Sequence, residues 1–137
     1  MRQEFFDLEI NTNGQKLYEF TDKTTYWINN TNLKNGILNL SIQHTSASLI
    51  VQENADPDVQ TDILNYFDRL VPMDSNLYVH TTEGKDDMPA HIKSCLTNNQ
   101  ISLSIKNKKL QLGTWQGLYL FEHRLETQNR TIIHHFI

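Results

Sequence analysis

The sequence predicts an α+β fold, a single domain dominated by an antiparallel β-sheet with two or three helices. Leu38, Leu40 and Ile42 alternate with polar residues, which is the period of a half-buried strand. Residues 57–71 instead repeat their apolar side chains with the spacing of one helix face. From residue 101 onward, short strand-like segments are separated by polar turns, which indicates further antiparallel strands.

The N-terminal segment carries the signature of a hairpin. Residues 3–10 and 15–20 both contain strand-forming residues. The sequence between them, Asn11-Thr12-Asn13-Gly14, is typical of a tight turn because asparagine and glycine tolerate left-handed backbone. We therefore expect two strands paired with each other.

A helix is expected next, capped by Thr21 or Asp22 and running to about Leu33. Its propensity is weak because threonines and asparagines are frequent in it. The strand of residues 37–43 follows. Residues 49–51 form another apolar run, which predicts a further strand after a short turn.

The clearest helix covers residues 57–71. Asp56 lies where an N-cap belongs, Pro57 suits the first helical position, and Pro72 ends the helix. A single apolar stripe runs along it, formed by Val59, Ile63, Tyr66, Phe67 and Leu70.

A shorter helix is predicted at about residues 88–96, with Asp87 as its natural cap. His91 follows one turn after Asp87, and Cys95 follows one turn after His91. Residues four positions apart lie on the same helix face, so these three side chains share one face.

The C-terminal part is expected to contain four strands. Residues 101–105 and 109–115 flank one polar turn, and residues 118–125 and 130–136 flank another. Together with the N-terminal strands, they make the sheet the dominant element of the fold.

The length and charge of the chain exclude several classes of protein. Its 137 residues suit one domain, residues 1–137, with a core of its own. A net charge of −4 argues against a nucleic-acid-coating protein, because such a protein needs a basic face. Apolar runs fall short of the roughly 20 residues that a bilayer requires, and we see no signal peptide. We therefore expect neither nucleic acid nor a membrane among the partners.

Cys95 is the single cysteine, so no disulfide can form within the chain. This is typical of a reduced, cytoplasmic protein. We expect Cys95 to be a buried packing thiol rather than a nucleophile.

Residues 80–94 are the segment richest in reactive side chains. Two histidines and three carboxylates within fifteen positions offer metal ligands, general bases and general acids. Lys93 adds a cation that can hold a phosphate. The alternative is a solvated loop leading into a short helix. The five side chains are His80, Glu83, Asp86, Asp87 and His91.

Two further segments are candidates for a site. His44 follows a strand and precedes the hydroxyl residues Thr45 and Ser46, which suits a base or ligand beside an anion site; the alternative is an exposed histidine in a turn. Residues 113–117 place two glycines around a tryptophan and a glutamine, which indicates either a close backbone approach or a tight turn. Glu53 is a candidate that the capping of the following helix does not explain.

Near the C-terminus, Glu122 and Arg124 share one sheet face, with His123 on the other. A surface ion pair explains this arrangement. In the alternative, Arg124 and Arg130 bind phosphate together. The chain has no zinc-protease motif, no cysteine pairs and no glycine-rich nucleotide-binding motif.

These segments occur together and in order, and they resemble the motifs of the YjbQ-like family, whose members are often labelled secondary thiamine-phosphate synthases. The resemblance covers nearly the whole chain and is strongest from residue 36 to 124. The matching blocks are HTSASL at 44–49, ENADP at 53–57, LVP at 70–72, EGKDDMPAHIKS at 83–94, LGTWQG at 112–117 and EHR at 122–124.

The resemblance implies a compact α+β subunit that assembles as a homotrimer, with polar clefts between subunits. It also implies weak thiamine-phosphate synthase activity, which joins a pyrimidine methyl diphosphate to a thiazole phosphate. The partner would then be a small phosphorylated metabolite. A trimer would also cover apolar strand residues such as Tyr119 and Phe121, which we expect to be exposed.

Residue by residue, the resemblance and the chemistry together predict a site. The expected catalytic residues are His44, Glu53, Glu83, Asp86, Asp87 and His91. The expected substrate-binding residues are Thr45, Ser46, Lys93, Ser94, Thr114, Gln116, Arg124 and Arg130. The expected ligands of a divalent metal are His44, His80 and His91.

The identity of that metal separates three hypotheses for the function. Magnesium suits the diphosphate leaving group of a transferase acting on thiamine precursors. Three histidines instead favour zinc, and with it a metal-dependent hydrolase of a small phosphorylated or acyl substrate. The third hypothesis is a non-catalytic trimer whose cleft binds a metabolite.

Overall fold

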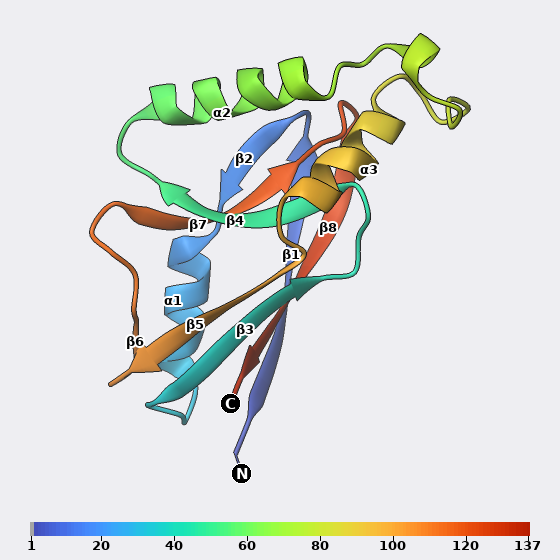
Figure 1. The fold of residues 1–137 in the computed structure, drawn as a ribbon. Helices are drawn as coiled ribbons and strands as arrows, with labels where there is room; N and C mark the ends of the chain where they lie inside the picture. The colour runs from blue at the N-terminus through green and yellow to red at the C-terminus, as the bar shows by residue number, and fades with distance from the viewer. Residues whose placement is uncertain (1) are drawn as a thin grey trace.

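A computed structural model describes residues 2–137 and confirms the α+β class, with two antiparallel sheets and three α-helices (Figure 1). The strands are β1 (Glu4–Asn13), β2 (Lys16–Glu19), β3 (Gly36–Ile42), β4 (Ala47–Glu53), β5 (Gln100–Lys106), β6 (Lys109–Leu110), β7 (Gln116–Glu122) and β8 (Thr127–Phe136). The helices are α1 (Thr21–Asn30), α2 (Pro57–Leu70), the 3₁₀ turn η1 (Ser75–Leu77) and α3 (Asp87–Leu96). The five-stranded sheet has the order β1-β8-β3-β5-β6, and the three-stranded sheet has the order β2-β7-β4.

One face of each sheet, together with α1, builds the main core. The alternation predicted for β3 is confirmed, because Leu38 and Leu40 are fully buried in this core. β7 contributes Leu118 and Leu120 from the other sheet, and both are also fully buried. Within residues 2–137, no helix has the length and apolar content that a bilayer crossing demands.

α2 lies across the outer face of the three-stranded sheet (Figure 1). Tyr119 and Phe121 of β7 are buried in this second cluster, and the ring of Phe67 meets Phe121 edge-on with centroids 5.5 Å apart. The prediction that Tyr119 and Phe121 are exposed is therefore wrong. The reason is that β7 is covered on both faces, by the main core and by α2.

The predicted N-terminal hairpin is also wrong. β1 pairs with β8 and β2 pairs with β7, so the two strands belong to different sheets. The turn itself exists, and Gly14 adopts a φ of +92° there. It redirects the chain from one sheet to the other, since β1 pairs along its whole length with β8 whereas β2 pairs with β7.

The same exchange of sheets occurs between β7 and β8. β7 pairs with β2 and β4, whereas β8 pairs with β1 and β3. The predicted polar turn is displaced toward the N-terminus, because residues 127–129 already belong to β8.

The helix predicted at 57–71 is confirmed as α2, and Asp56 caps it by accepting a hydrogen bond from the Asp58 N–H at 2.9 Å. α1 is shorter than predicted and ends at Asn30. Neither predicted residue caps α1, whose N-cap position is Phe20. β6 has only two residues instead of the seven predicted, and a turn follows in which the Gly113 N–H donates to the Gln116 side chain.

Candidate functional site

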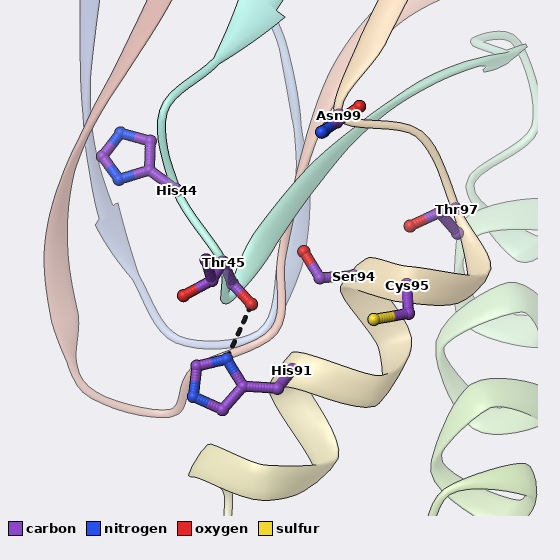
Figure 2. Close-up of a pocket in the computed structure, with 7 residues that line it drawn as sticks. All are labelled: His44, Thr45, His91, Ser94, Cys95, Thr97 and Asn99. Carbon is purple, nitrogen blue, oxygen red and sulfur yellow. Dashed lines mark hydrogen bonds between the residues drawn. The ribbon is translucent and has the colours of Figure 1, made fainter.

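The loop between β3 and β4 and one face of α3 together line a pocket of about 330 Å³ (Figure 2). Two hydrogen bonds fix the loop to the helix. The Ser94 hydroxyl donates to the Ala47 carbonyl at 2.6 Å, and His91 Nδ1 lies 2.8 Å from the Thr45 carbonyl oxygen. The pocket is lined by His44, Thr45, His91, Ser94, Cys95, Thr97 and Asn99.

Cys95 lies at the surface of this pocket, so the prediction of a buried packing thiol is wrong. It does share a helix face with His91, as its spacing indicated. The difference arises because this face of α3 borders the pocket instead of the core.

His80, Asp87 and His91 form a compact group that can hold a metal ion. Asp87 Oδ2 lies 2.8 Å from His80 Nε2 and 3.1 Å from His91 Nε2. One ligand atom from each residue falls within 4.8 Å of the others. Asp87 is buried, whereas the two imidazoles are partly exposed, so the group opens toward solvent.

The backbone sets the tautomer of His91. A carbonyl oxygen only accepts hydrogen bonds, so the ring nitrogen beside the Thr45 carbonyl must carry a proton. In the neutral ring, Nε2 then presents a lone pair toward the Asp87 carboxylate, another acceptor. A proton or a cation is needed to make this contact favourable. Metal-ligating histidines typically have this arrangement, with the second ring nitrogen held by a backbone carbonyl.

Arg124 holds the carboxylates of Asp86 and Asp87 in place. Its Nε and Nη1 donate to Asp86 and Asp87, each at 2.9 Å, and its Nη2 donates to the Glu83 carbonyl at 3.0 Å. The Leu125 N–H adds a bond of 2.8 Å to Asp86. Burial opposes ionisation of Asp86, but the Leu125 N–H and Arg124 outweigh it, so the pKa of Asp86 is lowered.

Asp87 is ionised for a related reason. Burial opposes its charge, but the hydrogen bond from His80, the charge of His91 and that of Arg124 lower its pKa. The prediction that Asp87 caps α3 is wrong, because Asp86 occupies the N-cap position and its own side chain makes no capping hydrogen bond within the described residues. The Asp87 carboxylate is turned toward the histidines and Arg124 instead.

His44 borders the pocket but is not part of the His80–Asp87–His91 group. Its Nε2 accepts the Thr131 N–H at 3.0 Å. Burial and the nearby charge of Arg130 lower the pKa of His44, so the ring is neutral at pH 7. Of the three histidines predicted to bind metal together, the structure brings two into one group and puts Asp87 in the third place.

Two predicted cations are held inside the protein. Lys93 is 2% exposed and donates to Asp68 of α2 at 2.6 Å. Arg130 is 4% exposed and forms an ion pair with Glu122, while also donating to Ser46. The Glu122 carboxylate thus forms its ion pair with Arg130. The surface ion pair between Glu122 and Arg124 that the sequence suggested is not formed.

Three further predicted site residues lie away from the His80–Asp87–His91 group in the fold: Glu53, Thr114 and Gln116. Glu53 pairs with Gln116 at the far end of β4 from Ala47, a separation of about 20 Å at roughly 3.3 Å per strand residue. One Glu53 carboxylate oxygen is buried and finds no hydrogen-bond partner among residues 2–137. Within one subunit, the structure does not bring these residues to the His80–Asp87–His91 group.

Sequence reasoning missed several residues of this region. Thr97 and Asn99 line the pocket, and Asp68 is the partner of Lys93. The Thr45 carbonyl is a backbone group, so no residue type marks it. Asp68 lies on the predicted helix next to its apolar stripe, but its partner cannot be identified without the fold.

The chain matches the family model described as UPF0047 protein YjbQ-like over residues 6–137. It is 48% identical over 128 residues to UPF0047 protein sll1880 of Synechocystis, which covers 93% of this chain and 87% of that protein. It is also 48% identical over 98 residues to UPF0047 protein YjbQ of Escherichia coli O157:H7, which covers 72% of this chain and 70% of that protein.

Solved structures share the fold across almost the whole chain. A structural genomics target from C. acetobutylicum superposes with a TM-score of 0.82 at 27% identity, covering 98% of this chain and 99% of that one. The conserved hypothetical protein TT1486 from Thermus thermophilus gives the same TM-score at 29% identity, covering 93% and 97%.

Proposed function

The chain belongs to the YjbQ-like family of UPF0047 proteins, and we propose that it is a metal-dependent hydrolase that binds its ion through His80, Asp87 and His91. The observation that carries this proposal is the hydrogen bond from His91 Nδ1 to the Thr45 carbonyl. It directs the Nε2 lone pair toward the Asp87 carboxylate, where only a proton or a cation relieves the repulsion.

The donor set favours zinc or another transition metal. Two imidazoles and one carboxylate match a common catalytic zinc set, which leaves one coordination position for water or substrate. Magnesium prefers oxygen ligands. A bound zinc ion would lower the pKa of its water and polarise a substrate carbonyl. The chain itself supplies the orientation of His91 through Thr45 and the charge of Asp87, which Arg124 holds in place.

The surroundings favour an acyl substrate over a phosphorylated one. The three cations predicted to bind phosphate each hold carboxylates: Arg124 binds Asp86 and Asp87, Lys93 binds Asp68, and Arg130 binds Glu122. Apart from the imidazoles of His44 and His91, the pocket is lined by hydroxyl, amide and thiol groups. Such groups suit a small polar ester or amide better than a dianion.

We expect purified protein to bind one zinc ion per chain and, when loaded, to cleave p-nitrophenyl acetate faster than p-nitrophenyl phosphate. A chelator should abolish the cleavage, and added zinc should restore it. His80→Ala should behave like the chelated protein, whereas His135→Ala, which changes a histidine outside the group, should not. Stoichiometric zinc without turnover of either ester would leave the non-catalytic metabolite-binding protein as the better proposal.

A second candidate is the thiamine-phosphate synthase reaction implied by the family resemblance. The carboxylates of Asp86 and Asp87 beside Arg124 support it, because oxygen ligands of this kind hold Mg²⁺ and tolerate a developing pyrimidine cation. Magnesium-dependent release of pyrophosphate from a pyrimidine methyl diphosphate and a thiazole phosphate would favour this transferase over the hydrolase.

We also propose that the protein is a cytoplasmic homotrimer. Glu53 and its strand partner Gln116 lie at the other end of β4 from the loop that binds His91, and Thr114 precedes Gln116 by two residues. A trimer with clefts between subunits would place these residues of one subunit beside the metal-binding group of the next. Light scattering at micromolar concentration should give three times the 16.0 kDa subunit mass, and a monomer mass would contradict the proposal.

A further inference from the structure

We propose that the buried ion pair between Glu122 and Arg130 is a positioning device for the metal-binding group. The inference rests on the metal site proposed above, and it assigns a role to two residues that do not touch the ion. Glu122 is completely buried at the end of β7, and Arg130 is almost completely buried near the start of β8. These two strands lie in different sheets, so the pair joins the sheets beside the site.

The Glu122 carboxylate is surrounded by donors. Arg130 binds both of its oxygens, with Nε at 2.8 Å from Oε1 and Nη2 at 2.6 Å from Oε2. The Thr12 hydroxyl donates to Oε1 at 2.6 Å. The backbone N–H groups of His123 and Arg124 donate to Oε2 at 3.0 and 3.1 Å. With five donors around it, this carboxylate holds its neighbours in one arrangement.

One path from the pair leads to His91. Arg130 Nη2 donates to the Ser46 carbonyl at 3.1 Å and to the Ser46 hydroxyl oxygen at 2.9 Å. The neighbouring Thr45 carbonyl accepts the proton of His91 Nδ1. The guanidinium therefore fixes Ser46, whose amide nitrogen belongs to the same peptide as the Thr45 carbonyl that orients His91.

A second path leads to Asp87. Glu122 holds the backbone N–H of Arg124, and the Arg124 guanidinium binds both Asp87 and Asp86. Two proposed ligands thus depend on the same buried carboxylate.

Stability alone does not explain the pair, because apolar residues of similar volume often stabilise a protein at least as well as a buried ion pair. An apolar pair would leave Ser46 and the Arg124 backbone N–H without these partners. The hydrogen bonds that the pair makes to Ser46 and to the Arg124 N–H are therefore its proposed role. Mutating groups that orient metal ligands typically changes metal affinity by about 10- to 100-fold.

The test compares cobalt binding by Arg130→Lys, Thr12→Val and Thr24→Val with that of the wild type. Lysine keeps the positive charge but lacks the planar guanidinium, whose several N–H donors reach Glu122 and Ser46 at the same time. Thr24→Val is the matched control for Thr12→Val: both threonines are buried and both bond a buried partner, but Thr24 bonds His134, away from the site. The visible absorption of bound Co²⁺ reports ligand geometry, and titration gives its affinity.

We expect Arg130→Lys to weaken Co²⁺ binding by about 10- to 100-fold and to alter the visible spectrum. Thr12→Val should weaken it several-fold, whereas Thr24→Val should lower the melting temperature but keep the wild-type affinity and spectrum. If Arg130→Lys does not fold, the two threonine variants decide the matter. Equal Co²⁺ affinity and spectra in the wild type and Thr12→Val would then overturn the positioning role. A wild type that binds no Co²⁺ would instead overturn the metal site itself.

Discussion

Replacing His91 with alanine is expected to abolish zinc binding and to leave the melting temperature close to that of the wild type. The variant removes one of three proposed ligands, together with the nitrogen that faces Asp87. The imidazole is about one third exposed and borders the pocket, so water can replace its bond to the Thr45 carbonyl. Calorimetric zinc titration and a thermal melt of the metal-free protein measure the two effects separately.

His135→Ala is the control for this experiment, because it removes a histidine that bonds Gln3 near the N-terminus. It should bind zinc like the wild type. The prediction would be contradicted if His91→Ala lowered the melting temperature and still bound zinc. That outcome would show that His91 is a structural residue, whose loss costs about 1–3 kcal/mol through an unpaired polar group.

Lowering the pH from 7 to 5 is expected to destabilise the protein by about 2 kcal/mol for each of two buried histidines. Burial lowers the pKa of His134 to about 4, and burial together with the charges of Lys93 and Arg130 lowers that of His123 to about 3. In the unfolded chain these rings titrate near 6.5. Between pH 6.5 and 4 the unfolded state therefore binds more protons, so the stability that is complete above pH 6.5 is lost as the pH falls.

Adjacent residues of β8 provide a matched pair of variants for this prediction. His134 is fully buried, and its Nε2 accepts the Thr24 hydroxyl at 2.8 Å; His135 lies on the other face of the strand and is partly exposed. Urea unfolding at pH 7 and pH 5 should show that His134→Gln loses about 2 kcal/mol less than the wild type between the two conditions. His135→Gln should lose as much as the wild type. Equal pH dependence in His134→Gln and the wild type would contradict the assignment.

Local sequence determined the elements whose signals lie within a few residues. α2 was predicted because its cap, first-turn proline and apolar stripe all lie within it, and Asp56 does cap it. β3 was predicted because alternation is itself the pattern of a half-buried strand, and its leucines are fully buried. The contact between Asp87 and His91 follows from helical spacing alone.

Spacing along the chain could not determine how the strands pair. The turn before β2 predicted a hairpin, yet β1 pairs along all ten residues with β8 and β2 pairs with β7, partners about a hundred or more positions away. The same long-range pairing places Tyr119 and Phe121 beneath α2. The apolar pattern within β7 does not show whether these two residues are covered or exposed.

For the candidate site too, the sequence identified some of the residues and the tertiary structure decided their contacts. The sequence by itself identified His80, Asp87 and His91 as reactive side chains, because their types and spacing carry that information. Only the tertiary structure grouped Asp87, and not His44, with the other two histidines and paired Glu122 with Arg130. The physical reason is that these contacts form where two sheets and α3 meet, and the positions of such surfaces depend on every strand pairing at once.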